Sequence, residues 1–241
     1  LATVLVACNK YKWDKVSGGD ANAATLSNGG YYVEQGGYAY FINGYDAGTT
    51  DENGVTQPVD NSWGKPVKNA IVRVNINADG TYDNASAKVI VPKQIHNEYK
   101  EGGFAIFGEW IYYATPNSDK DKNGKASTTH TDFMRTKIDG SVTQLIATIN
   151  SRSTEYLFTP NRIIYRESSS ATTIDYIDFS GMKGDKSSAG AKGVKYGTLA
   201  SNVENVFWNY DASYTRGQGA VISDYIVYTE TLTGDDSYEF C

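Results

Sequence analysis

A short cassette of aromatic and aliphatic residues returns four times along this chain of 241 residues. The copies are Tyr38-Ala39-Tyr40-Phe41, Trp110-Ile111-Tyr112-Tyr113, Arg162-Ile163-Ile164-Tyr165 and Tyr225-Ile226-Val227-Tyr228. They begin 72, 52 and 63 residues apart. This spacing fits a repeated unit of roughly 40 to 50 residues that carries insertions. The repeat constrains the fold strongly, because every copy must form the same local structure.

Each cassette is the second of four short β runs. The runs are separated by turn pairs: Gly36-Gly37, Gly108-Glu109 and Pro160-Asn161 after the first run, and Asp79-Gly80, Asp139-Gly140 and Ser180-Gly181 after the third. Such residues connect adjacent antiparallel strands. No stretch longer than about ten residues keeps the apolar spacing of a helix. The sequence therefore predicts an all-β fold.

The repeat length and the four runs per unit predict a β-propeller of four-stranded antiparallel blades over residues 29–241. The expected blades are approximately 29–93, 102–149, 153–201 and 203–241. They amount to roughly three and a half blades, whereas propellers usually have about four to eight. We therefore expect the protein to continue past Cys241.

Equivalent cassettes predict equivalent positions in the blades. Ala39, Ile111, Ile163 and Ile226 should share one position, and Phe41, Tyr113, Tyr165 and Tyr228 should share another. The second position follows two residues after the first and so lies on the same face of the strand. Both sets should be buried between adjacent sheets.

The start of the chain predicts a lipid anchor. Residues 1–7 are uncharged and lead into Leu5-Val6-Ala7-Cys8, which resembles the bacterial lipobox. The resemblance implies that Cys8 is lipidated, that residues 1–8 contain the end of a signal peptide, and that the mature protein starts at Cys8. Residues 9–28 have the composition of a flexible tether. The chain has no initial Met and no basic segment, so we expect it to start inside the signal peptide.

Two other interpretations of Cys8 stay open. Residues 2–7 could form a β-strand with Cys8 as a buried thiol, or Cys8 could form a disulfide with Cys241. These are the two cysteines of the chain, too few for a disulfide framework or a zinc site.

One blade carries a family resemblance. The second repeat resembles a repeat of extracytoplasmic bacterial proteins. The segments that carry the resemblance are Gly108-Glu109-Trp110-Ile111-Tyr112-Tyr113 and residues 133–141, which end in Lys137-Ile138-Asp139-Gly140-Ser141. That repeat is similar to TolB-like propellers. The first repeat matches it loosely, and the third and fourth keep mainly the Ile-x-Tyr core. The resemblance implies a propeller fold and leaves the activity open, since the family has no common assigned activity.

The charge of the chain excludes one class of partner. The formal net charge is −6, and clustered Lys and Arg are absent from the sequence pattern. Proteins that bind the phosphate backbone present such basic clusters, so nucleic acid is not an expected partner. No apolar stretch approaches the ~20 residues that span a bilayer, so membrane attachment would come from the lipid.

A loop in the second repeat resembles the start of a calcium-binding loop. Asp119, Asp121 and Asn123 alternate before Gly124, as in loops whose oxygen ligands converge on Ca²⁺. His130 occupies the position where a bidentate Glu is expected, although Asp132 follows it. An ordinary Asn-Gly turn explains the same residues without a metal. Ca²⁺ is the one cofactor that the sequence suggests.

Catalytic patterns are scarce. The two histidines, His96 and His130, lack metal-ligand spacing, and no nucleophile elbow or phosphate-binding loop occurs. Trp63 lies in a polar, bent segment and is the best candidate for a ligand-binding residue. The larger aromatic set could form a sugar-stacking surface, but core packing is the preferred interpretation for each member: Tyr40, Trp110, Tyr112, Trp208 and Tyr210.

Two functional classes follow. The favoured one is a lipid-anchored propeller on the outer face of the bacterial cell membrane. It would act as a binding or scaffold module for glycan, peptide or another envelope protein. The alternative is an envelope enzyme that acts on carbohydrate through loop carboxylates. The repeats, tether and anchor favour the binding module, and we lean against an enzyme.

Overall fold

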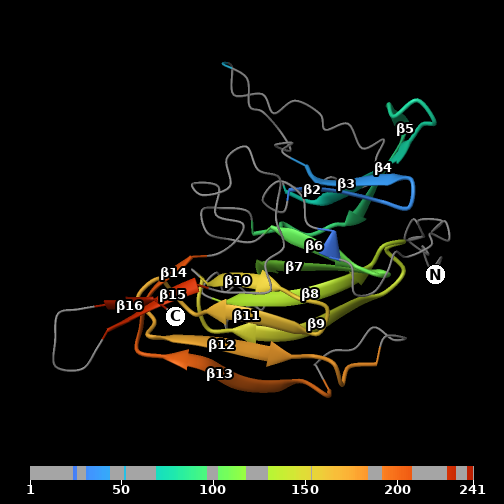
Figure 1. The fold of residues 1–241 in the computed structure, drawn as a ribbon. Helices are drawn as coiled ribbons and strands as arrows, with labels where there is room; N and C mark the ends of the chain where they lie inside the picture. The colour runs from blue at the N-terminus through green and yellow to red at the C-terminus, as the bar shows by residue number, and fades with distance from the viewer. Residues whose placement is uncertain are drawn as a thin grey trace.

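The computed structural model describes residues 24–25, 31–43, 52, 69–96, 103–117, 130–152, 154–183, 192–207, 227–231 and 238–240. Every regular element in these ranges is a β-strand, and no helix occurs among them. The all-β prediction is confirmed. The strands form four separate antiparallel sheets. Figure 1 shows the sheets following one another in chain order, from the blue and teal strands to the orange and red ones.

The first two sheets are formed by consecutive strands. The first sheet contains β2 (Tyr32–Gln35), β3 (Tyr38–Ile42), β4 (Ile71–Ile76) and β5 (Tyr82–Val91), in that order. The second contains β6 (Phe104–Phe107), β7 (Trp110–Pro116), β8 (Thr131–Lys137) and β9 (Thr143–Ile149). Each strand pairs with the one before it, so each sheet is a simple meander.

The remaining sheets follow the same order. The third sheet contains β10 (Glu155–Phe158), β11 (Arg162–Arg166), β12 (Thr173–Asp178) and β13 (Lys195–Ser201). The fourth has three described strands, β14 (Val203–Phe207), β15 (Val227–Thr231) and β16 (Tyr238–Phe240). All neighbouring pairs are antiparallel. The prediction of antiparallel sheets from the turn residues therefore holds.

One short strand departs from the sequence prediction. β1 (Ala24–Thr25) pairs with β6 and adds a fifth strand to the second sheet. These two residues fall inside the segment 9–28 that we predicted to be a tether. The prediction is wrong for them because two residues without an apolar pattern give no local strand signal, and their pairing depends on the exposed edge of β6.

The fourth strand of the first sheet also begins earlier than the sequence suggests. The apolar run of the sequence predicts this strand over 88–91, but β5 begins at Tyr82. Between Arg73 and Asn75 the register with β5 shifts, because Asn75 pairs with Asp83 whereas Arg73 pairs with Lys88. Within this bulge Ser86 Oγ accepts a hydrogen bond from the Asn75 N–H at 2.8 Å and donates to Asp83 O at 2.6 Å. A polar side chain thus replaces part of the strand pairing.

The strand register confirms that the cassettes of the first three sheets are equivalent. Tyr40 pairs with Arg73, Tyr112 with Arg135, and Ile164 with Tyr176. The same backbone hydrogen bond closes each turn region: Ile76 to Gly37, Ile138 to Glu109 and Phe179 to Asn161, at 2.9, 3.0 and 3.0 Å. Ala39, Ile111 and Ile163 therefore share one position. Ile226 lies outside the described residues.

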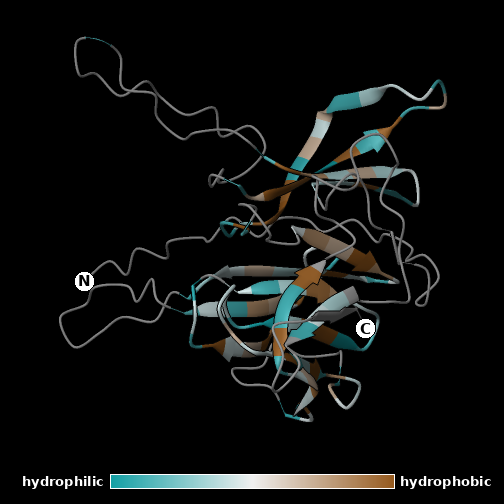
Figure 2. Ribbon diagram, turned by 60° about the vertical axis from the view of Figure 1, so that its left-hand side comes forward, coloured by the Kyte–Doolittle hydropathy of each residue, from teal (hydrophilic) through white to brown (hydrophobic). Residues whose placement is uncertain are grey.

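Alternate cassette residues face opposite neighbours. Ile111 and Tyr113 pack in a cluster with Val33 and Tyr40 of the preceding sheet, and Ile163 packs against the second sheet in the same way. The residues between them, such as Tyr112, face the following sheet. The first three sheets therefore each have two apolar faces. Figure 2 shows brown, hydrophobic segments along many of the strands.

The burial prediction holds for four of the seven described residues in the two sets. Ala39, Ile111, Ile163 and Tyr113 are fully buried. Phe41, Tyr165 and Tyr228 are only half-buried, although each packs on the expected face of its sheet.

Candidate functional site

The two ends of the sheets differ in the connections that they carry. At one end, which we call the turn end, the strands of the first two sheets join through tight turns, with glycines at positive φ such as Gly80 (83°) and Gly140 (81°). The connections β3–β4 and β7–β8 leave from the opposite end, which we call the loop end, where Ile42 pairs with Ile71 and Pro116 with Thr131. Two other long connections leave from the turn end, β12–β13 and β14–β15, where Asp178 pairs with Lys195 and Phe207 with Val227. Both ends therefore carry connections suited to a ligand surface, and two adjacent sheets share the loop end for theirs.

The predicted site residues belong to these longer connections or to the N-terminal segment. Trp63 lies in the β3–β4 connection, and Asp119, Asp121 and Asn123 lie in the β7–β8 connection. These residues and Cys8 lie outside the described residues. The described part of the chain contains no group of three or more His, Cys, Asp or Glu side chains suited to a metal ion. The calcium, ligand and lipid assignments stay predictions.

Asp132 closes the base of the β7–β8 connection. Its Oδ1 accepts hydrogen bonds from Asn117 Nδ2 at 2.8 Å and from Thr148 Oγ1 at 2.7 Å. The Asn117 N–H also donates to His130 O at 3.1 Å. Asp132 is buried, so these donors replace water around its carboxylate. The sequence suggested Asp132 as a substitute calcium ligand, but its observed contacts hold the two arms of the connection together.

Buried polar groups at the loop end also join the sheets. Arg166 donates from Nε to Ala171 O at 2.8 Å and from Nη2 to Glu204 O of β14 at 3.0 Å. The Tyr156 hydroxyl lies within 3.3 Å of His96 O and 3.4 Å of Gly103 O, next to the second sheet. The Arg166–Ala171 bond braces the β11–β12 connection, whereas the Arg166–Glu204 bond links the third sheet to the fourth and the Tyr156 contacts link it to the segments before the second sheet.

Arginine side chains stack on aromatic rings in three successive sheets. The guanidinium carbon lies 4.5 Å from the ring centre in the Arg73–Tyr38 pair and 4.3 Å in the Arg135–Trp110 pair. The third sheet has the pair Arg162–Tyr176 at 5.1 Å. A cation over an aromatic face is attracted by the ring quadrupole. The sequence analysis missed these pairs, although a basic residue inside an apolar strand was a visible signal at Arg73 and Arg135.

The aromatic residues that were considered as a sugar-stacking surface are mostly part of the core. Tyr40 and Tyr112 are buried. Burial raises the pKa of Tyr40 to about 12, so its hydroxyl is neutral at physiological pH. Trp110 is half-buried, with Arg135 over its ring and Lys137 Nζ at 5.7 Å. Trp208 and Tyr210 lie outside the described residues.

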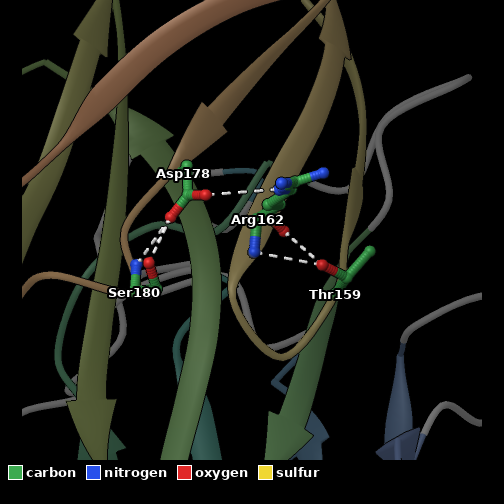
Figure 3. A network of polar contacts seen from close by, with 4 residues as sticks. All are labelled: Thr159, Arg162, Asp178 and Ser180. Atoms are coloured by element: carbon green, nitrogen blue, oxygen red, sulfur yellow. Dashed lines mark hydrogen bonds and ion pairs between the residues drawn. The ribbon is translucent and has the colours of Figure 1, made fainter.

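A polar network surrounds Arg162 at the turn end of the third sheet (Figure 3). Arg162 Nε lies 3.4 Å from Asp178 Oδ2. The Asp178 Oδ1 atom accepts hydrogen bonds from the Ser180 N–H at 3.0 Å and the Ser180 hydroxyl at 2.6 Å. Thr159 Oγ1 accepts a hydrogen bond from the Arg162 N–H and donates one to the Arg162 carbonyl oxygen, both at 3.0 Å. The network fixes an exposed guanidinium group and a carboxylate in one arrangement.

These contacts give a prediction for titration with acid. The Ser180 hydroxyl and N–H, together with Arg162, lower the pKa of Asp178 below its ordinary value of 3.8. The stabilising effect of the ionised form is therefore present above pH 3.8 and is lost as the pH falls through the folded-state pKa. Carboxyl-carbon NMR should show the pKa of Asp178 rising in Ser180→Ala.

Asp79 supplies the control for this titration. The Thr81 hydroxyl and N–H lower its pKa in the same way, but in another sheet. Ser180→Ala should leave the pKa of Asp79 unchanged. An unchanged pKa of Asp178 in this variant would contradict the assigned cause.

Comparison with protein-family models and with curated proteins finds no match to this chain. The described part of the chain has no helix that is long and apolar enough to cross a membrane.

Proposed function

We propose that the four sheets are consecutive blades of a β-propeller, and that the protein is a lipid-anchored binding or scaffold module on the outer face of the bacterial cell membrane. The observation that carries this proposal is the repeated meander. Four antiparallel sheets follow in chain order, and each packs its faces against its neighbours. Propeller blades have this order and this packing.

The first sheet gives further support. Its face turned away from the second sheet carries a separate apolar cluster that includes Ala39, Val72, Val74 and Val89. All four side chains are buried. A sheet at the end of an open stack would need only one apolar face. An apolar second face is expected when every sheet lies between two others, as in a ring of blades.

The position of the longer connections supports a binding function. The β3–β4 and β7–β8 connections leave the same end of adjacent sheets, from a base that buried polar groups hold in place. Rigid scaffolds commonly present ligand-binding loops in this way. Trp63 belongs to one of these connections and Asp119, Asp121 and Asn123 to the other. Envelope glycans, peptides or proteins are the ligands that we propose.

The lipid anchor rests on the resemblance of Leu5-Val6-Ala7-Cys8 to the lipobox, and Cys8→Ala tests it. Without a thiol at position 8 no diacylglycerol can be attached, so the variant should move from the membrane fraction to the soluble fraction of an expressing bacterium. Two or more acyl chains anchor stably, so the difference should be nearly complete. Fractionation followed by immunoblotting measures it.

Cys241→Ala is the matched control, because Cys241 is the other cysteine of the chain. This variant should stay in the membrane fraction. Equal membrane retention of wild type and Cys8→Ala would refute the anchor.

A further inference from the structure

The arginine–aromatic pair changes its arrangement in the third sheet. In the first two sheets the arginine lies on the third strand, β4 or β8, and the ring lies on the second strand, β3 or β7. In the third sheet Arg162 takes the position of the ring and Tyr176 takes the position of the arginine. The stacking is kept, but the cation moves to a different strand.

The first two arginines serve the packing of the sheets. Arg73 is buried and its Nη1 lies 3.5 Å from Ile138 O at the end of the second sheet. Arg135 is also buried, and it donates from Nε to Gln144 Oε1 at 2.7 Å. Its Nη2 lies 3.5 Å from Lys183 O beside the third sheet. Both guanidinium groups are therefore occupied by neighbouring sheets.

Arg162 is in a different situation, because 49% of its side chain is exposed. Its Nε faces Asp178, and no described residue accepts a hydrogen bond from Nη1 or Nη2. Figure 3 shows a terminal nitrogen pointing away from the Asp178 carboxylate. A guanidinium group offers two parallel donors that match the two oxygens of a carboxylate. Arg162 can therefore accept an external anion without leaving its place.

The surroundings hold Arg162 in this position before any ligand binds. Thr159 fixes its backbone, Ser180 fixes Asp178, and the Tyr176 ring lies under the guanidinium group. Tyr176 in turn lies directly on Gly197, where an added Cβ would come within 2.5 Å of the ring. Position 197 therefore requires glycine, because a Cβ atom there would clash with the Tyr176 ring. Such preorganisation reduces the entropy lost on binding.

Further cations lie beside Arg162 although the chain is acidic. Lys195 pairs with Asp178 on the side opposite to Arg162, so the row across three strands alternates in charge. The Cα atoms of Arg162 and Lys195 are thus about 10 Å apart, two strand spacings. Lys183 and Lys192 are also exposed, and the close approach of Gly181 to Gly193 brings their segments together. Among the described residues of this corner the cations Arg162, Lys183, Lys192 and Lys195 outnumber the Asp178 carboxylate, in a chain of net charge −6.

We propose that this corner of the third sheet, which we call the Arg162 site, binds an acidic glycan through its carboxylate groups. Arg162 holds one carboxylate through its two terminal nitrogens, and Lys195 attracts a carboxylate on an adjacent unit. The hydroxyl groups of Thr159 and Ser180 lie around the arginine, and each keeps an acceptor lone pair that suits the hydroxyl group of a sugar. This inference rests on the proposed extracytoplasmic binding function and adds a second ligand site, at the turn end, to the connections at the loop end.

The test measures binding of polygalacturonate, which carries one carboxylate on each sugar unit, to the full chain by biolayer interferometry at low salt. Arg162→Gln should weaken binding about tenfold or more, because two charge-assisted hydrogen bonds are lost. Lys195→Gln should have a smaller effect. Arg152→Gln is the matched control, because Arg152 is an exposed arginine at the loop end, and it should bind like wild type. Added salt should weaken wild-type binding.

Arg162→Lys is a second variant that distinguishes a loss of binding from a folding defect in Arg162→Gln. It keeps the positive charge but loses the paired donors, so it should bind with an affinity between those of wild type and Arg162→Gln. Equal binding by Arg162→Gln and Arg152→Gln would overturn the proposal, as would equal binding of neutral dextran and polygalacturonate. Equal, Arg162-dependent binding of polyglutamate would assign the site to acidic peptides and overturn the glycan. A protein that keeps its Cys8-dependent membrane fraction but does not bind polygalacturonate refutes this site alone.

Discussion

Replacing Ile111 or Ile163 by alanine should lower the free energy of unfolding by about 2 to 5 kcal/mol. Both side chains are fully buried, and each faces the preceding sheet. Truncation removes three carbon atoms from a packed interface and leaves a cavity that neighbouring strands cannot fill without moving. Urea unfolding followed by circular dichroism measures the loss.

The two variants also test the order of the sheets. Ile111 lies between the first and second sheets, whereas Ile163 lies between the second and third. Because the two clusters are separate, the double variant should lose the sum of the single losses within about 0.5 kcal/mol. Strong coupling between the two positions would contradict the separate interfaces.

A leucine of the third sheet provides the control for burial. Leu199 lies on β13 and 48% of it is exposed. Leu199→Ala should change the free energy of unfolding by less than about 0.5 kcal/mol. If it costs as much as Ile163→Ala, the assignment of inner and outer positions in this sheet is wrong.

The success of the sequence analysis came from local patterns. The cassette around Ile111 and the turn at Gly108-Glu109 specify adjacent strands within a few residues, and the apolar run 104–107 before this turn coincides with β6. Alternation then assigns Ile111 and Tyr112 to opposite faces without knowledge of the neighbouring sheets. These features depend on short-range geometry, which the sequence carries directly.

The missed features depend on partners distant in the sequence. β1 forms only because the edge of β6 is available, and the bulge of β5 depends on Ser86 replacing a strand partner of Asn75. The exchange between Arg162 and Tyr176 likewise becomes visible only when three sheets are aligned by register. A single strand does not reveal whether its arginine will be buried under another sheet or exposed.

This difference between arginines gives the second large expected effect. Arg135→Ala should lower the free energy of unfolding by about 2 to 4 kcal/mol. The buried guanidinium group donates to Gln144 and stacks on Trp110, so its removal leaves the Gln144 Oε1 atom without this donor and uncovers the ring. Loss of a hydrogen bond from a charged donor costs about 1.5 to 3 kcal/mol, and the lost stacking adds to this.

Arg162→Ala is the matched control, because it removes the same kind of stacked cation from a half-exposed position. Water can replace its contacts, so the loss should stay below about 1 kcal/mol. Combining Arg135→Met with Gln144→Leu should recover part of the loss of Arg135→Ala, since an apolar pair of similar volume removes the buried charge together with its acceptor. Equal losses for Arg135→Ala and Arg162→Ala would show that burial by the next sheet does not distinguish the two arginines. The Arg162 site would then have no structural basis for being free to bind a ligand.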